Sequence, residues 1–375
     1  MRKFKTVIIH SDYKFVSASK CFETPYLENT IVIIKRLGEE YKGPYQNSAV
    51  FIEKHEKNKL LQLCQEADLV VMYGLYHFNS TVVLELPKSI KIIWRLLGYE
   101  LYSKKLDLFV SDLTKEFVDL PEQLSFLKKI YRVARYGYID NPTFYKAVKR
   151  VDFMMAICQE EYDFLQGHFK NLPKFIKVPH PQLGEKFKPK APKTRSQKPI
   201  ILLGNSRHAF NNHLDLIALV DSVQVKHRYS FKLLSSYGPT TAYYNALKKA
   251  TADKPYYQLV EKFLELDEFK DFYANVDALV INTYRQMAVG NILYGVKNGT
   301  KIYLNKKNTI YKWLRNEGFI IYTIENFKND LKTGNFCLAA DKAEHNIKLS
   351  IALEEKYSVE SFQQLLLKKV LYLQK

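Results

Sequence analysis

The residues best suited to binding an anionic ligand directly follow an apolar run of strand length, and they are Gly204, Asn205 and Ser206. The run is Ile200 to Leu203, and behind the three residues a helical pattern begins at Asn211 or Asn212, either of which is a good N-cap. A glycine permits close approach to the backbone, and a helix N-terminus carries partial positive charge. The segment therefore favours a diphosphate site. A turn whose polar side chains bond their own backbone would give the same pattern.

A second junction of the same kind carries a cation. The apolar run Ala278 to Ile281 leads through a loop with Arg285 and Gln286 into a helical pattern that opens around Gly290 and Asn291. A departing nucleoside diphosphate develops negative charge that a metal ion, or cations and N–H groups, must meet. The chain contains no Asp-x-Asp pair, so we expect Arg285 and backbone N–H groups to act without a metal or another cofactor. A solvated or salt-bridged surface arginine is the alternative interpretation of Arg285.

A membrane-binding face is predicted for residues 126 to 135. At 100° per residue, the apolar side chains of this segment fall on one side of a helix and the basic side chains on the other. A helix of this kind can lie in an anionic membrane interface. An ordinary surface helix with one face packed on the sheet is the alternative. The basic side chains are Lys128, Lys129, Arg132 and Arg135.

The elements that must position these residues alternate between strand and helix. In the first half, apolar and β-branched runs are separated by stretches of helical period, such as Lys57 to Glu66, which is typical of βα units in a parallel sheet. A Lys- and Pro-rich stretch from Gly184 to Pro199 then predicts a linker. The predicted strands before it are Thr6 to Ile9, Thr30 to Ile34, Leu69 to Met72 and Ile90 to Trp94.

The same alternation restarts at Ile200, so we predict two α/β domains of Rossmann type. Their expected limits are 1–183 and 200–345, with the linker at 184–199 and a helical tail at 346–375 that packs on the first domain. Ligands of open α/β sheets bind beyond the carboxyl ends of the strands, so a cleft between two facing sheets is expected. The further predicted elements are strands Ser230 to Leu234 and Lys301 to Leu304, and helices His213 to Val223 and Asn291 to Lys297.

Length and composition limit the class of protein. A chain of 375 residues with 47% apolar residues can bury a large core in two domains. Its formal charge of +18 favours polyanionic partners, but the short RNA-recognition and helix-turn-helix signatures are absent, so we expect no nucleic acid. The four cysteines lack zinc-site spacing, and no secretory signal or membrane-spanning run is found. We therefore expect a peripheral protein at the cytoplasmic face of the inner membrane.

Several of these motifs occur in the same order in one known family. Gly204-Asn-Ser, Asn211-Asn-His213, Ser236-Tyr-Gly238 and Arg285-Gln286 with Gly290 resemble the N-acetylfucosamine transferases of glycosyltransferase family 56. The first half resembles the family through Val7-Ile-Ile-His10 and Gly98-Tyr-Glu-Leu-Tyr102. Two residues depart from it, since Glu100 stands where the family has Asp and Tyr73 where it has His.

The resemblance implies a GT-B glycosyltransferase with two facing Rossmann-like domains, the acceptor in the first and the donor in the second. The family transfers 4-acetamido-4,6-dideoxygalactose from a dTDP donor to a polyprenyl-diphosphate-linked glycan in the synthesis of enterobacterial common antigen. In this chain Arg285 is expected to stabilise the leaving group. The residues expected to hold the donor are Gly204, Asn205, Ser206, Asn212, Tyr237, Gln286, Gly290 and Asn291.

The catalytic base and the acceptor stay open at this point. An inverting transferase needs a base near the acceptor hydroxyl, and we prefer Glu100 and Asp12 over His10 and His77, all of which follow predicted strands. A loop carboxylate is more often a cap or a solvated group. One alternative function is another GT-B transferase, for a fucosyl or amino sugar in capsule or O-antigen synthesis. A basic nucleic-acid-binding protein is the other.

Overall fold

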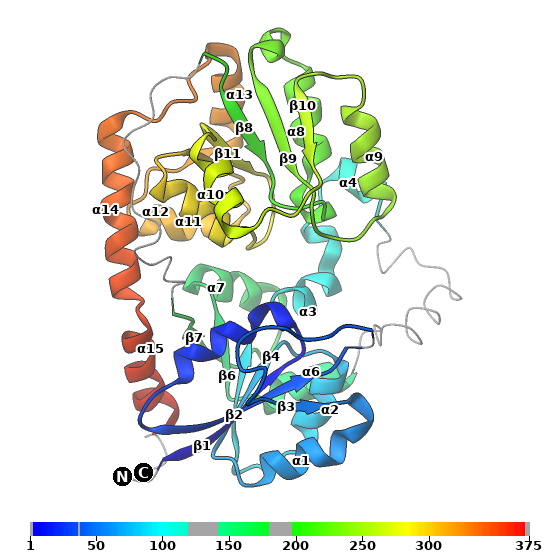
Figure 1. Cartoon of the computed structure of the whole chain (residues 1–375), viewed down its shortest axis with the longest axis vertical. Coiled ribbons are helices and arrows are strands. Elements are labelled where there is room, and N and C mark those ends of the chain that lie inside the picture. Colours follow the sequence, from blue (N-terminus) through cyan, green and yellow to red (C-terminus); the bar gives the residue numbers. More distant parts are fainter. Residues whose placement is uncertain (1–2, 37, 119–141, 180–196, 372–375) are drawn as a thin grey trace. The chain divides into compact units, whose positions relative to one another are not determined.

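The computed structural model describes residues 3–36, 38–118, 142–179 and 197–371 (Figure 1). Its contacts divide the chain into two compact units. The first unit comprises Met1–Lys104, Ser125–His180 and Lys356–Lys375, and the second comprises Lys105–Leu124 and Pro181–Glu355. The units are therefore not simple halves of the sequence, because a short early segment belongs to the second unit and the C-terminal segment belongs to the first. The domain limits given above stay a prediction.

The first unit is built on a parallel sheet of seven strands in the order β3-β2-β1-β4-β5-β6-β7. All five residues of β4 are buried, as expected for a parallel strand with both faces covered. The strand order reverses between β1 and β4, which is where open α/β sheets bind ligands. The strands are β1 (Phe4–His10), β2 (Leu27–Ile34), β3 (Val50–Ile52), β4 (Leu69–Tyr73), β5 (Lys91–Arg95), β6 (Phe153–Ala156) and β7 (Lys174–Lys177).

Helices follow most of these strands, and the C-terminal helix completes the core of the unit. In Figure 1 the red helix α15 (Val359–Leu366) lies beside the blue N-terminal elements, which it also contacts. Phe362 is 4% exposed and packs edge-on against Phe22, and burying such a side chain contributes about 1.5–3 kcal/mol. The other elements are η1 (Tyr13–Phe22), α1 (Lys57–Gln65), α2 (His77–Glu85), α3 (Tyr99–Tyr102), α6 (Pro142–Arg150) and α7 (Gln159–His168).

The second unit repeats this topology with six parallel strands in the order β10-β9-β8-β11-β12-β13. Its order reverses between β8 and β11. The strands predicted from the sequence are confirmed almost residue for residue, whereas β10 and β13, like β3, β6 and β7 of the first unit, were not predicted. The strands are β8 (Ile200–Leu203), β9 (Ser230–Leu234), β10 (Tyr257–Val260), β11 (Ala278–Ile281), β12 (Lys301–Leu304) and β13 (Tyr322–Thr323).

Helices surround this second sheet. The cyan helix α4, from the early segment of the chain, packs beside the green helix α8 (Figure 1). The helices are α4 (Asp112–Lys115), α8 (His213–Asp221), α9 (Ala242–Thr251), α10 (Leu266–Ala274), α11 (Val289–Lys297), α12 (Thr309–Asn316), α13 (Ile324–Thr333) and α14 (Ala340–Lys356).

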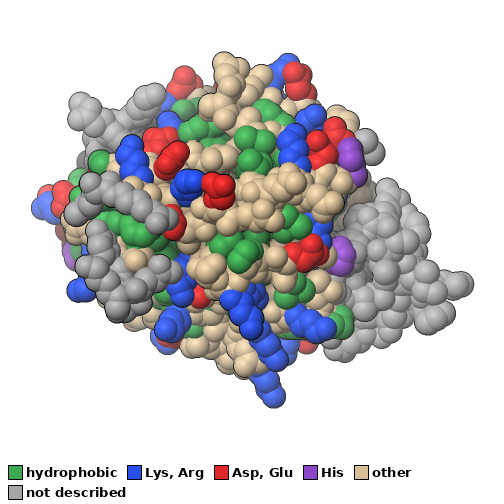
Figure 2. Space-filling model, turned by 90° about the horizontal axis from the view of Figure 1, so that it is seen from below, with side chains coloured by type: hydrophobic (Ala, Val, Ile, Leu, Met, Phe, Trp, Pro, Cys, Tyr) green, Lys and Arg blue, Asp and Glu red, His purple; other side chains and the backbone are tan. Residues whose placement is uncertain are grey.

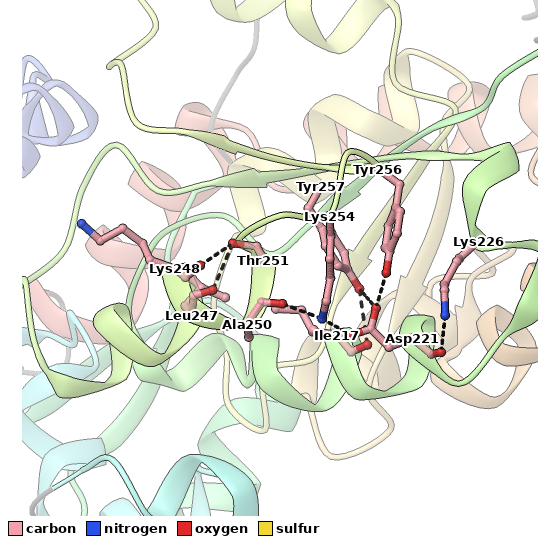
Figure 3. A network of polar contacts seen from close by, with 10 residues as sticks. All are labelled: Ile217, Asp221, Lys226, Leu247, Lys248, Ala250, Thr251, Lys254, Tyr256 and Tyr257. Atoms are coloured by element: carbon pink, nitrogen blue, oxygen red, sulfur yellow. Dashed lines mark hydrogen bonds and ion pairs between the residues drawn. The ribbon is translucent and has the colours of Figure 1, made fainter.

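A polar cluster around Asp221 fixes the edge of this sheet at which the strands begin (Figure 3). Lys254 Nζ lies 2.6 Å from Asp221 Oδ2, and the hydroxyls of Tyr256 and Tyr257 donate to Oδ1 over 2.9 and 3.1 Å. Burial, with Asp221 beside it, raises the pKa of Tyr256 to about 12, so this tyrosine stays a hydrogen-bond donor at neutral pH. The cluster joins the end of α8 to the start of β10 and leaves the opposite edge of the sheet for ligands.

The described residues on the face drawn in Figure 2 do not form one continuous basic field. Lys and Arg side chains on this face stand among acidic and hydrophobic ones. Within the described ranges, no helix is long and apolar enough to cross a membrane. The predicted membrane face with Lys128, Lys129, Arg132 and Arg135, and all but the last residues of the predicted linker, lie outside the described residues.

Candidate functional site

Gly204 begins the loop that follows β8, at the point where the strand order of the second unit reverses. Its N–H donates to Val280 O over 2.9 Å, and its φ of +69° is one that favours glycine. A Cβ atom at this position would lie 2.2 Å from Nε2 of the buried His213. The loop therefore requires glycine here for two separate reasons, backbone conformation and contact with the helix behind it.

The loops after β8 and β9 are joined by hydrogen bonds. Asn205 Nδ2 donates to Tyr237 OH over 2.7 Å, and Arg207 Nε donates to Gly238 O over 2.6 Å. Burial raises the pKa of the Tyr237 hydroxyl, although the side chain as a whole is 37% exposed. Asn205 Oδ1 is buried and has no hydrogen-bond partner in the described chain. Asn205 and Tyr237 thus form an edge at which a ligand can meet both an amide and an aromatic ring.

Ser206 lies beneath this edge rather than on it. The side chain is fully buried, and its hydroxyl oxygen accepts a hydrogen bond from Asn211 Nδ2 over 3.1 Å. The same Asn211 amide also donates to Ser206 O over 2.9 Å. Among the residues predicted to hold the donor, Ser206 is therefore placed to shape the loop.

Helix α8 begins directly after Asn212, as predicted, but the Asn212 side chain does not cap it. Its backbone is left-handed, with φ of +48°, and its side chain is fully buried. Asn212 Nδ2 donates to Asn282 O over 3.1 Å, and Asn212 Oδ1 accepts from Ser111 N over 2.8 Å. The first N–H of the helix, that of His213, instead donates to Tyr243 OH over 2.7 Å. The Asn212 side chain thus connects Ser111 with the loop after β11, and its role in donor binding stays a prediction.

Arg285 lies half-buried in the loop that follows β11. Its guanidinium carbon stands 4.4 Å from the centre of the Phe210 ring, a distance at which a cation is attracted by the ring face. Phe210 belongs to the loop after β8 and is itself buried. The cation is thus held across the point where the strand order reverses, instead of extending freely into solvent as a surface arginine would.

Helix α11 starts three residues after Gln286, which is also half-buried. Its second residue, Gly290, is exposed, and a Cβ added there would meet no atom within 4 Å. The open N-terminus of this nine-residue helix presents N–H groups with partial positive charge. Asn291 Nδ2 donates to the buried Tyr273 OH over 2.7 Å, so its side chain ties α11 to α10.

His10, at the end of β1 in the first unit, is fully buried. Its Nε2 lies 2.6 Å from Ser19 Oγ, and its ring packs against Tyr73 with centroids 4.1 Å apart. Burial lowers the pKa of His10 to about 3, far below the operating range of a good general base. His10 is therefore a neutral, weakly basic imidazole in this state.

The carboxylates predicted as bases have structural partners in the first unit. Asp12 accepts from Lys14 N over 3.1 Å and lies 3.3 Å from Arg36 Nη2, which makes it a helix cap and an ion-pair partner. Glu100 is 3% exposed, and burial raises its pKa. Its Oε1 accepts from Trp94 Nε1 and from Leu97 N over 3.1 and 2.9 Å.

Of the four predicted acid–base candidates, only His77 is an exposed residue, at the start of α2. In the part of the chain that is described, no three His, Cys, Asp or Glu side chains gather as metal ligands. All four cysteines are free thiols.

Three residues near Arg285 were missed from the sequence. Thr283 and Asn308 are fully buried behind the Arg285 loop, and Phe210 supports the guanidinium. A signal for Thr283 existed, because a hydroxyl residue directly after a buried strand lies at the ligand-binding edge. No sequence signal pointed to Phe210, because an aromatic residue in a loop predicts core packing equally well.

Comparison with known proteins supports the fold. No family model matches the chain, and no curated protein matches it in sequence. Sucrose-phosphate synthase from Thermosynechococcus elongatus matches in structure with a TM-score of 0.64 and 10% identity over 100% of both chains. The HepE protein of Anabaena, solved with UDP and glucose, matches with a TM-score of 0.62 and 12% identity over 98% of this chain and 99% of its own.

A glycosyltransferase from Rickettsia africae is equally similar, with a TM-score of 0.63 and 12% identity over 98% of both chains. Each similarity covers both units and nearly the full length of both proteins. Such low identities carry information on fold and not on substrate. The chain therefore has the GT-B glycosyltransferase fold, with two Rossmann-type parallel sheets.

Proposed function

We propose that the protein transfers a sugar from a nucleoside diphosphate donor bound at the β8/β11 edge of the second unit. The observation that carries this proposal is the combination of Arg285, stacked on Phe210, with the open N-terminus of α11 on the same loop. Both features lie where the strand order reverses. A fixed cation and helix N–H groups together suit a diphosphate.

During this reaction, negative charge develops on the leaving group next to the Arg285 loop. An acceptor hydroxyl attacks the anomeric carbon, the bond from that carbon to the phosphate oxygen breaks, and its electron pair stays on the leaving nucleoside diphosphate. The acceptor proton passes to a base. Arg285 and the α11 N–H groups are preorganised for the charge on the leaving group, which is where electrostatic catalysis is most effective. This step needs no bound metal, and we expect transfer to continue in EDTA.

The opposite side of the donor is assigned to Gly204, Asn205 and Tyr237. The unpartnered Asn205 Oδ1 is an acceptor, so it suits a hydroxyl or N–H of the donor and not a phosphate oxygen. Tyr237, exposed beside it, offers a ring to the nucleoside. UDP in the HepE structure makes a uridine nucleotide the first donor to test, and the dTDP donor implied by the sequence resemblance is the second.

The finer identity is also a proposal. The resemblance to family 56 favours 4-acetamido-4,6-dideoxygalactose as the sugar and a polyprenyl-diphosphate-linked glycan as the acceptor, bound by the first unit. Another fucosyl or amino-sugar transferase of capsule or O-antigen synthesis would share the donor edge. A thermal-shift series with UDP, dTDP, GDP and a short oligonucleotide separates these functions, because a selective ligand stabilises the folded protein. A shift with the oligonucleotide alone would favour the nucleic-acid-binding alternative.

Replacing Gly290 by alanine should change stability and nucleotide affinity in opposite directions. The new methyl group meets no protein atom within 4 Å, and alanine favours a helix over glycine by about 0.5–1 kcal/mol. The free energy of unfolding should therefore rise. A diphosphate over the α11 N–H groups would collide with the methyl group, and the affinity for UDP or dTDP should fall by about tenfold or more. Urea unfolding and isothermal titration calorimetry measure the two effects.

Gly167→Ala is the matched control for this prediction. Gly167 is an exposed glycine of α7 in the first unit, and a Cβ there also meets no atom within 4 Å. It should gain stability in the same way while leaving nucleotide affinity unchanged. If Gly290→Ala binds nucleotide as tightly as the control does, the diphosphate does not lie at the N-terminus of α11.

The membrane proposal rests on the sequence of residues 126–135 and on the charge of +18. Each basic residue near an anionic leaflet contributes about 1 kcal/mol, and salt screens this attraction. Changing Lys128, Lys129, Arg132 and Arg135 together to Gln should reduce sedimentation with vesicles of phosphatidylglycerol at low salt. Nucleotide affinity should stay the same. Normal vesicle binding by this variant would assign the segment to the protein's own packing.

A further inference from the structure

The backbone of the Arg285 loop is held by a chain of two hydrogen bonds, one buried and one partly buried. Asn308 Nδ2 donates to Thr283 Oγ1 over 2.7 Å, and Thr283 Oγ1 donates to Arg285 O over 3.0 Å. Both Thr283 and Asn308 are fully buried. The backbone carbonyl of Arg285 is thereby linked to Asn308 at the start of α12. This helix follows β12, the strand next to β11 in the sheet.

The direction of this chain is fixed by chemistry. A threonine hydroxyl has one hydrogen to donate. Thr283 can give that hydrogen to Arg285 O only if its bond with Asn308 is one in which Asn308 is the donor. Asn308 supplies that donor. Its own orientation is fixed because Asn308 Oδ1 accepts from Ile310 N over 2.9 Å as the cap of α12. The amide therefore cannot turn round without losing the cap.

Arg285 is consequently held at two points. The Thr283 hydroxyl fixes its backbone carbonyl, and the Phe210 ring lies against its guanidinium group. A guanidinium held in this way loses little freedom when a phosphate arrives, which is the condition for strong electrostatic stabilisation of a transition state.

We infer that Thr283 and Asn308 are positioning residues that hold Arg285 against the leaving diphosphate, an inference that rests on the proposed function. Removing the Thr283 hydroxyl takes away the acceptor of the buried Asn308 amide and the donor to Arg285 O, which frees the loop. A small displacement of a group that acts in the transition state lowers turnover far more than it weakens substrate binding.

The test is Thr283→Val, with Thr300→Val as the matched control. Thr300 is also fully buried, and its hydroxyl donates to Val276 O over 3.2 Å at the edge where the strands begin. Thr283→Val should lower kcat by about 10- to 100-fold with the donor KM changed by less than about threefold. Thr300→Val should change neither, and Thr283→Ser should restore kcat.

Two further variants make the test independent of simple loss of stability. In an Arg285→Ala background, Thr283→Val should lower kcat no further, because the two residues act through one cation. Asn308→Asp retains the cap of α12 but removes the N–H donor, so it should behave like Thr283→Val. Thr283→Val with the turnover of Thr300→Val, or with an equal effect in the Arg285→Ala background, would overturn the inference.

Amide hydrogen exchange separates a failure of this inference from a failure of the proposed function. Residues 284–290 should exchange faster in Thr283→Val than in Thr300→Val. If the wild-type protein transfers no sugar from any donor tested, the proposed function fails, and this comparison alone decides whether Thr283 holds the loop. Equal exchange in the two variants would overturn the positioning role whatever the activity.

Discussion

Replacing Arg285 by alanine is expected to lower kcat by about 30- to 1,000-fold, which corresponds to about 2–4 kcal/mol of transition-state stabilisation. The reason is the fixed position of the cation on the loop that opens α11, with its guanidinium against Phe210. Stability should fall much less, because Arg285 is only half-buried. Single-turnover kinetics at saturating donor measure the chemical step directly.

Two further variants test whether the loss of turnover comes from the Arg285 cation. Arg285→Lys retains the charge but loses the planar stack on Phe210, so its turnover should lie between those of the wild type and the alanine variant. Arg228→Ala removes an exposed arginine that precedes β9, at the other edge of the sheet, and should leave kcat unchanged. Wild-type turnover in a folded Arg285→Ala protein would remove the cation from the mechanism.

The strands of the second unit can be predicted from the sequence because they are local patterns. Ile200–Leu203, Ser230–Leu234, Ala278–Ile281 and Lys301–Leu304 occupy the predicted positions, since a buried parallel strand is a continuous apolar run. The loops that follow β8 and β11 are then neighbours through topology alone. For this reason the sequence by itself is enough to make Gly204 and Arg285 candidates for one site.

Four of the missed strands lie at sheet edges and have weaker patterns, whereas the missed β6 is a fully buried apolar run inside its sheet. β3 and β13 are very short, β7 is flanked by lysines, and β10 contains a half-exposed tyrosine and an exposed glutamine. Edge strands are covered on fewer sides, so their sequences need fewer apolar residues. The sheet around them supplies the pairing that decides their conformation.

The roles of individual polar residues depend on contacts that the sequence does not reveal. Asn212 has the residue type and position of a helix cap. Its side-chain oxygen, however, accepts a hydrogen bond from the backbone N–H of Ser111, 101 residues earlier in the chain. Ser111 Oγ also donates to Asp215 in the first turn of α8, over 2.5 Å. Glu100 is held through Oε1 by Trp94 and Leu97, while its Oε2 is buried with no partner among the described residues, so its role as a base stays a prediction. Local patterns place such residues at the right edge of a sheet, and only tertiary contacts decide which way they face.

Gly204→Ala is expected to destabilise the second unit by about 2–5 kcal/mol, the sum of two costs. A φ of +69° disfavours any side chain. The added Cβ would also lie 2.2 Å from His213 Nε2 and 3.0 Å from Asn211 Oδ1, and overpacking of this kind costs about 1–3 kcal/mol. His213 cannot easily give way, because its ring is fully buried, its backbone N–H donates to Tyr243 OH, and its Nδ1 lies 3.4 Å from the same hydroxyl.

Gly38→Ala isolates the first of these costs. Gly38 has a φ of +76°, but no atom lies within 4 Å of a Cβ placed there, so only backbone strain should appear, at about 1–2 kcal/mol. The overlap itself is measured by a double-mutant cycle with His213→Ala, which removes the ring that the new methyl group meets. The cost of Gly204→Ala in urea unfolding should shrink in that background. Equal costs in both backgrounds would mean that the loop after β8 moves away from α8, and that Gly204 is required by its backbone conformation alone.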